Sequence, residues 1–366
     1  MRRSLPILGV ALAALLITLP SAAQEAEQNR SRVSFAFELQ GGYDDNITEL
    51  SDRDKDRVGD PAFADQFKIE APGDYAWKPS ARLGWSMNLA KRVRTSVQLD
   101  AQASQYVSSS VKNYEVYALR VEQDLSAAKV FQTRLALKVS DVPDYYLREL
   151  RVPGTTDFAS ERYHSRQYAV ALKQLFAPKL LSVAVLGNRT DRNYESPFDE
   201  RDGDLTGYGA EVELGRLTTR AGLLVGYQRS HYDARGDEGS TLAIEPDISS
   251  DRDELSAQAA FRWALGYITL SGLREDRNYT TENATDIYHF ERSDTKTEYE
   301  LGFRQGLPAG LYLEVGVSRE ENRSHLAPGV SPTLATDVTD YTRDIVTACL
   351  GWRFRTGPDR AKDPSP

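Results

Sequence analysis

The sequence predicts an all-β protein: a transmembrane antiparallel meander β-barrel of about 14 strands, within a range of about 12 to 16. Apolar and polar residues alternate with a period of two along most of the chain. The connections between these runs alternate between short and long, and many runs begin or end in Tyr, Trp or Phe. Alternation of this kind marks strands with one apolar face, and the other two features are typical of barrels that lie in an outer membrane.

The N-terminus has the pattern of a secretion signal. Arg2 and Arg3 precede the apolar run 5–20, and the small residues Ser21, Ala22 and Ala23 follow it. We expect residues 1–23 to be a cleaved signal peptide, with an uncleaved membrane anchor as the alternative. After residue 23 no apolar run approaches the roughly 20 residues that a spanning helix needs. The expected organisation is then a short periplasmic segment at 24–31, the barrel at 32–355 and a disordered periplasmic tail at 356–366.

The alternation is clear in the first run, where Val33, Phe35 and Phe37 are interleaved with Ser34 and Glu38. Helical spacing does not compete convincingly in any run. The expected strands are 32–44, 75–88, 92–106, 113–123, 130–140, 163–174, 179–189, 204–215, 219–230, 253–263, 266–275, 294–305, 310–319 and 342–355.

The connections favour a barrel over its soluble alternatives. Long connections are expected at 45–74, 141–162, 190–203, 231–252, 276–293 and 320–341, whereas most of the others have only a few residues. Outer-membrane barrels pair short periplasmic turns with long outer loops. A secreted β-sandwich has shorter strands, of about five or six residues, and a solenoid or propeller would show a fixed repeat period that this chain lacks.

Aromatic residues near the run ends predict the two girdles that flank the lipid-facing band. The chain has 19 Tyr and 12 Phe but only 2 Met, which suits this use of aromatic side chains. The predicted girdle residues are Tyr75, Trp77, Trp85, Trp263, Tyr299, Trp352 and Phe354.

The polar face of the runs should line a water-filled lumen, because 14 strands enclose more space than side chains usually fill. The early strands carry a predicted basic wall of Lys78, Arg82, Arg94, Arg120, Arg134 and Lys138. The later strands carry a predicted acidic wall of Glu211, Glu213, Glu298, Glu300 and Glu314. Two interpretations stay open: a transverse field that orients or selects a polar solute, or interior ion pairs that keep the wall satisfied and rigid.

The long connections are rich in charge. Residues 45–74 hold nine acidic and four basic residues. We interpret this stretch as a solvated loop rather than as a site where divalent cations bridge to anionic lipid. The run 52–60 is not a calcium loop, because Arg and Lys stand where oxygen ligands belong.

We expect no enzyme, no cofactor and no metal site. The four histidines fit no zinc motif, and no G-x-S-x-G elbow is present. His231 with Asp233 is the best candidate dyad, but spacing alone does not make a catalytic site. The single Cys349 excludes an intramolecular disulfide. The net charge of -9 and the lack of a basic stripe argue against nucleic-acid binding.

The motif at the end of the first run, Gly41-Gly42-Tyr43-Asp44-Asp45-Asn46, resembles that of the β-barrel porin 2 family of Gram-negative bacteria. This resemblance implies an outer-membrane barrel linked to exopolysaccharide export. A weaker resemblance is to the barrel domain of surface lipoprotein assembly modifiers, which implies lipoprotein transfer. Those proteins typically carry a helical repeat domain before the barrel, for which residues 24–31 leave no room. The polar stretch after Phe354 also departs from barrels that end on an aromatic residue.

The expected function is a channel that passes a hydrophilic cargo, either a small solute or an exopolysaccharide, through a charged lumen. The alternatives are a translocon for surface lipoproteins and a plugged structural or interaction barrel whose loops bind partners. The expected partners are outer-membrane lipid and lipopolysaccharide, the barrel assembly machinery and a periplasmic export partner.

Overall fold

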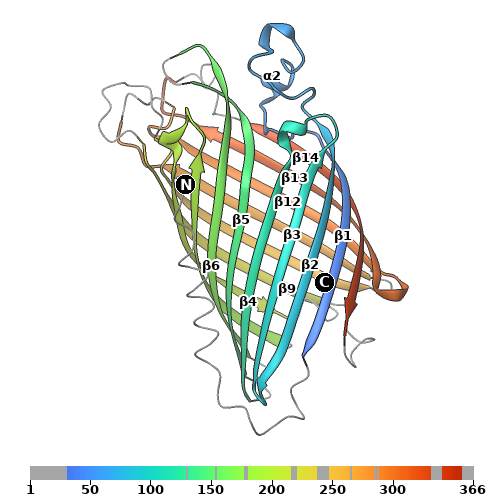
Figure 1. Ribbon diagram of the computed structural model, residues 1–366. Coiled ribbons are helices and arrows are strands. Elements are labelled where there is room, and N and C mark those ends of the chain that lie inside the picture. Colours follow the sequence, from blue (N-terminus) through green and yellow to red (C-terminus); the bar gives the residue numbers. More distant parts are fainter. Residues whose placement is uncertain are drawn as a thin grey trace.

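The computed structural model describes residues 31–356 except 129–130, 153–154, 177–179, 216–220, 237–246, 264–265, 284–285, 287 and 331–339. The chain forms a closed barrel in which each strand pairs with its neighbours in the sequence and β1 pairs with β14 (Figure 1). The strands are β1 (Arg32–Asp44), β2 (Asp74–Ala90), β3 (Val93–Tyr106), β4 (Tyr114–Ala128), β5 (Phe131–Arg151), β6 (Phe158–Phe176), β7 (Leu181–Tyr194), β8 (Gly203–Leu214), β9 (Ala221–Ala234), β10 (Ser250–Trp263), β11 (Gly266–Tyr279), β12 (Ser293–Gly306), β13 (Leu311–His325) and β14 (Tyr341–Arg355).

The barrel closes with a register that keeps one face apolar around the seam. On β1, Phe35 lies opposite Phe354 of β14 and opposite Leu83 of β2. Because side chains alternate between faces, a slip of one residue would turn every apolar side chain inward. The predicted all-β antiparallel meander of about 14 strands is confirmed.

The outer surface is a continuous apolar belt. Large apolar side chains are exposed on every strand, among them Phe37 (44%), Leu301 (49%) and Leu350 (53%). A soluble protein rarely exposes an apolar patch of more than a few hundred Å², whereas a closed barrel in lipid requires such a belt. The chain is therefore a bacterial outer-membrane protein. Among the described residues, no helix combines the length and apolar character needed to cross a bilayer.

Exposed aromatic side chains lie toward both edges of this belt. Tyr43 and Tyr75 are in ring contact at 4.9 Å near the long-loop end, and Phe35 and Trp352 are 6.0 Å apart near the short-turn end. On β2, ten residues separate Tyr75 from Trp85, about 33 Å along the strand and about 25 Å of membrane height at a tilt of about 40°. The predicted girdle residues all lie on the exposed outer face: Tyr75, Trp77, Trp85, Trp263, Tyr299, Trp352 and Phe354.

Several strands run further than the sequence predicts. β5 and β6 fill most of the expected loop 141–162, and β13 continues to His325. The connection expected at 141–162 is therefore shorter than predicted, whereas the one expected at 320–341 begins after His325. Beyond the membrane both faces of a strand can be polar, so the period-two signal disappears although the hydrogen-bonded ladder continues.

The predicted signal peptide at 1–23, nearly all of the segment 24–31 and the tail from residue 357 onward lie outside the described residues. Thr356, the first residue of the expected tail, continues the β1 pairing. Its backbone N–H donates to the Val33 carbonyl at 2.9 Å, and its hydroxyl accepts from the Val33 N–H at 2.9 Å.

Candidate functional site: the lumen and its outer mouth

The eleven charged residues predicted to line the lumen alternate along their strands with the exposed apolar residues, so they lie on the inner face. They are Lys78, Arg82, Arg94, Arg120, Arg134, Lys138, Glu211, Glu213, Glu298, Glu300 and Glu314. The side chains of Arg82 and Arg120 are each 47% exposed although they lie at the depth of the apolar belt. A charge that is exposed at this depth needs water inside the barrel.

Much of the basic wall is neutralised by neighbours in the same wall. Arg82 Nε lies 2.6 Å from Asp100, Arg120 Nη2 lies 2.7 Å from Glu122, and Arg134 Nε lies 2.7 Å from Asp124. Arg94 instead donates to the Ser86 hydroxyl at 3.2 Å. These contacts fit the interpretation of the wall as a rigid, satisfied surface.

Over the described ranges of the chain, two lysines of the basic wall differ from its paired arginines in their lack of an ion-pair partner. Among the residues that the structure describes, no carboxylate lies within ion-pair distance of Lys78 or Lys138. Lys138 is exposed on the inner face of β5. These two ammonium groups therefore leave a positive excess on the early strands.

The acidic wall is similarly divided. Glu213 binds Lys173 at 2.7 Å across the intervening β7, and Glu314 accepts from Arg304 Nε at 2.7 Å. Glu300 accepts a long hydrogen bond of 3.4 Å from the Ser271 hydroxyl. Within the described ranges, Glu211 and Glu298 have no cation at ion-pair distance. The lumen thus keeps charges of opposite sign on different strands after its local pairs are formed.

The first outer loop, residues 45–73, crosses the mouth of the barrel. At one end, the side chains of Asn46 and Lys55 donate to the Thr342 carbonyl of β14 at 3.1 and 3.0 Å. Further along, Lys68 lies 3.3 Å from Glu149 of β5 and donates to the Ser160 hydroxyl of β6 at 2.9 Å. β14 and β6 are six strands apart in a ring of 14, so the loop spans almost the full width of the opening.

This loop is folded, and its interpretation as a solvated stretch was wrong. Its α2 helix (Asp52–Lys55) is capped by the Ser51 hydroxyl, which accepts from the Asp54 N–H, and α2 is labelled above the strands in Figure 1. Ile47, Leu50 and Ile69 form a buried cluster with Ala76 and Tyr106 of the barrel. Apolar residues spaced along a charged run were the signal that could have shown this packing.

Glu49 is the acidic residue that the loop places among the cations of the mouth. Its backbone is left-handed, with a φ of 58°, and Arg343 of β14 lies 3.5 Å from its carboxylate. Burial raises the pKa of Glu49, but the positive charges of Lys296, Arg343 and Arg148 outweigh burial and hold this pKa below its ordinary value of 4.5. The carboxylate therefore stays ionised and tied to the barrel at neutral pH.

Lys112, in the connection between β3 and β4, is buried beside this loop. Its ammonium donates to the Tyr146 carbonyl at 2.9 Å and lies 5.0 Å from the centre of the Tyr145 ring. Burial lowers the pKa of Lys112 to about 8. Burial of the charged ammonium therefore opposes closure of the mouth, and the carbonyl and the ring face offset this cost only in part.

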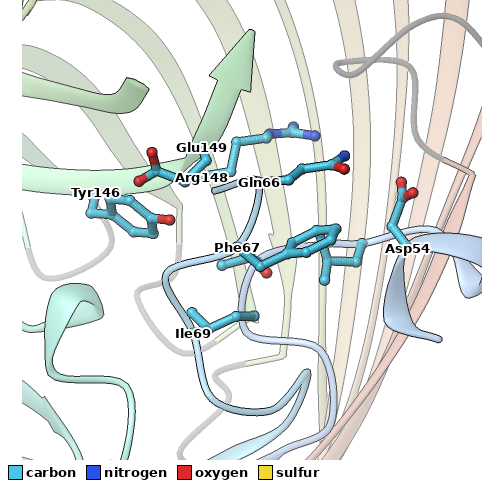
Figure 2. A pocket seen from close by; sticks show the side chains of 9 residues that line it. Asp54, Gln66, Phe67, Ile69, Tyr146, Arg148 and Glu149 are labelled. Atoms are coloured by element: carbon cyan, nitrogen blue, oxygen red, sulfur yellow. The ribbon is translucent and has the colours of Figure 1, made fainter. Parts of the chain in front are cut away.

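A small cavity lies beneath the loop (Figure 2). The side chains of Gln66 and Phe67 from the loop face those of Arg148 and Glu149 from β5. The volume of this cavity, about 20 Å³, is large enough for a water molecule and too small for a solute. This part of the mouth is therefore a packed contact rather than a route of passage.

Tyrosines form a ladder across the inner face near the mouth, and no pattern in the sequence predicted this ladder. Tyr114, Tyr145, Tyr163 and Tyr194 come from β4, β5, β6 and β7, with ring centroids 5.1, 5.3 and 5.1 Å apart. Arg192 lies over the Tyr163 ring at 5.6 Å. The rings meet only through the register of separate strands, so the signal was weak in any single run.

Within the described chain, three of the four histidines each lie within hydrogen-bond distance of an aspartate. His231 Nδ1 lies 2.8 Å from Asp251, its direct cross-strand partner, so the suggested dyad with Asp233 was wrong. His289 pairs with Asp286 at 2.9 Å in a buried turn. In the part of the chain that the structure describes, no three His, Cys, Asp or Glu side chains are close enough together to hold a metal ion.

No family model and no curated protein matches the chain. Solved structures of similar architecture include the anion-selective porin from Comamonas acidovorans (12% identity, TM-score 0.42, 89% of this chain and 100% of that one). Another is the TodX monoaromatic hydrocarbon channel deltaS2 mutant (9% identity, TM-score 0.42, 94% of each chain). A third is the outer membrane protein OprD from Pseudomonas aeruginosa (10% identity, TM-score 0.38, 89% and 94%). Likenesses this distant say nothing about what this chain binds or passes.

Proposed function

We propose that this protein is an outer-membrane channel that passes small hydrophilic solutes through its charged lumen. The observation that carries this proposal is the exposure of charged side chains, such as Arg82 and Arg120, on the inner face at the depth of the apolar belt. Because ions are not stable in a dry apolar interior, this wall implies a water-filled path.

The dimensions of the barrel fit this role. Fourteen strands about 4.8 Å apart and tilted by about 40° make a backbone cylinder about 28 Å across. Side chains that project about 6 Å from each wall would leave about 16 Å for water and solute. The first loop, anchored to both β14 and β6, narrows the outer end of this path.

The narrowed mouth favours small solutes over a polymer. A loop held by a buried apolar cluster and by polar contacts at both ends would have to unfold before an exopolysaccharide could pass. Nothing in the described geometry favours lipoprotein transfer. The resemblance to the β-barrel porin 2 family, which implied exopolysaccharide export, is not supported by any family model.

Swelling of proteoliposomes tests this proposal. The purified full-length chain is reconstituted, and swelling is followed in isotonic solutions of a pentose, a disaccharide and a high-molecular-weight dextran. We expect fast swelling with the pentose, slower swelling with the disaccharide and none with dextran. If none of the three solutes causes swelling, although the reconstituted protein keeps its folded, heat-modifiable mobility in gels, the channel proposal fails and a plugged interaction barrel replaces it.

A further inference from the structure

One part of the inner wall is hollowed between polar side chains, and it is distinct from the loop-covered mouth. The strand register places Arg120, Lys138, Ala169, Asn188 and Gly207 in one row from β4 to β8. Neighbouring strands lie about 4.8 Å apart, so Lys138 and Asn188 project from points about 10 Å apart with small residues between them. We call this feature the inner shelf.

A cavity of about 220 Å³ occupies the inner shelf. The next row of the register adds Ala136, Ala171 and Leu186 to its lining, followed by Gln228 at the far side. A volume of this size accepts a solute of several non-hydrogen atoms. The shelf therefore has an apolar floor with polar groups at both ends.

Two cationic side chains, Arg120 and Lys138, are among the residues that line this cavity. Lys138 is exposed to the lumen, and among the described residues its ammonium has no carboxylate at ion-pair distance. Lys138 lies directly opposite Arg120, a like-charge pair that is unfavourable unless an anion lies nearby. Glu122 balances Arg120 at 2.7 Å, which leaves one positive charge in excess.

Asn188 adds a second and independent observation. Its Oδ1 is shut off from solvent and accepts no hydrogen bond within the described residues, whereas the residue as a whole is only half-buried. Because Oδ1 is closed to solvent, this side chain presents no acceptor oxygen to the cavity. A Cβ at position 207 would collide with Asn188 Oδ1, so Gly207 leaves the room in which this orientation is held.

We infer that the inner shelf is a binding site for a small monocarboxylate, with its carboxylate on Lys138 and its short hydrocarbon part on Ala136, Ala169 and Ala171. A carboxylate supplies the acceptor oxygens that the donors require, and a single negative charge matches the single excess cation. The apolar floor excludes fully hydrated ions as the best ligands. This inference rests on the proposed function, for which it names the class of solute.

Calorimetric titration of the folded, detergent-solubilised full-length chain with butanoate tests the site without requiring an open channel. We expect saturable binding by the wild type that Lys138→Gln weakens about 10- to 150-fold, since a hydrogen bond to a charged group contributes about 1.5–3 kcal/mol. Ala169→Leu, which fills the apolar floor, should abolish binding. Lys78→Gln is the matched control, because it removes an equally unpaired lumen lysine from β2, and it should change the affinity less than about twofold.

Two further ligands test whether the site recognises a carboxylate that carries a short hydrocarbon part. Butanamide, the neutral isostere, should not bind, and inorganic phosphate should bind more weakly than butanoate because it cannot use the apolar floor. Equal losses in Lys138→Gln and Lys78→Gln, tighter binding of phosphate, or no binding of butanoate by the wild type would each overturn the inference. Swelling without butanoate binding would support the channel proposal and refute the proposed binding site on the inner shelf. Butanoate binding without swelling would support the binding site and refute the channel proposal.

Discussion

The contact between Arg343 and the first loop offers a sharp test of how the mouth is closed. Arg343 Nε donates to Asp44 at 3.0 Å and its Nη1 lies 3.5 Å from Glu49. Asp44 in turn accepts from the Asn46 N–H at 3.1 Å, so the guanidinium fixes the point where β1 passes into the loop. We predict that Arg343→Met loosens the loop while the barrel stays folded.

The size of this effect follows from burial. The Arg343 side chain is 18% exposed and that of Asp44 is 9% exposed. Removing one partner of a buried ion pair costs about 3–5 kcal/mol, and the remaining exposure of the arginine reduces this to about 2–3 kcal/mol. Since 1.4 kcal/mol corresponds to a factor of ten, the open form of the loop should become about 30 to 150 times more populated.

Hydrogen exchange measures that population directly. The amide of Ile47 donates to the Pro72 carbonyl at 2.9 Å, and the amide of Leu50 donates to Asn46 Oδ1 at 2.8 Å. Both amides should exchange about 30 to 150 times faster in the variant. The matched control is Arg319→Met, which removes an exposed arginine and should change their exchange by less than about fivefold. Exchange in Arg343→Met that matches the control would refute this account of the mouth.

Three further predictions concern the same molecule. The pKa of Glu49 in the closed loop is below its ordinary value of 4.5, so Glu49 contributes fully to the stability of the closed loop above pH 4.5 and loses this contribution as the pH falls below that value. Hydrogen exchange of the loop amides should therefore accelerate below pH 4.5, and Glu49→Gln should remove this acceleration. The pKa of Lys112 is about 8 in the closed mouth and 10.5 when solvated, so the closed mouth should become more stable as the pH rises from about 8 to 10.5. Hydrogen exchange of the loop amides in Lys112→Met should show no such trend. Leu301→Arg, on the lipid face, should destabilise the barrel by about 2–4 kcal/mol in denaturant unfolding, whereas Glu300→Arg on the lumen face should cost far less; equal costs would contradict the assignment of the two faces.

The barrel was predictable because lipid and water impose opposite demands on alternate residues. The membrane-spanning part of each strand, such as 294–305 in β12, therefore carries its own signal. The alternation of apolar and polar residues ends where the strand leaves the membrane. β5 continues through Tyr145 and Glu149 paired with β6, but register shifts between Val142 and Tyr145 and between Tyr146 and Arg148 break the alternation, and the sequence there suggests a loop.

The candidate site was predictable only in part, for a related reason. Alternation assigns Lys138 and Glu298 to the inner face, because a face is a property of one strand. Pairing depends on register between strands, so the contacts of Arg82 with Asp100 and of Lys173 with Glu213 could not be read from either run alone. The inner shelf also depends on the register, since it needs small residues in adjacent strands to fall in one row.

The fold of the first loop shows the limit of composition as a guide. Nine acidic residues suggested a solvated stretch, yet Ile47, Leu50 and Ile69 fold it across the mouth. Charge sets the average preference of such a segment for water, whereas a few apolar residues that can reach a common partner decide its structure.

The most direct test of the central claim is the conductance of the purified full-length chain in a planar lipid bilayer, with ion selectivity measured in a salt gradient. We expect discrete current steps through a water-filled lumen. We also expect a selectivity that moves toward cations in Lys78→Gln/Lys138→Gln, because that variant removes the unpaired positive charges of the early strands. The net-neutral variant Arg82→Gln/Asp100→Asn should keep the wild-type selectivity. The absence of current steps in folded, inserted protein would contradict the account.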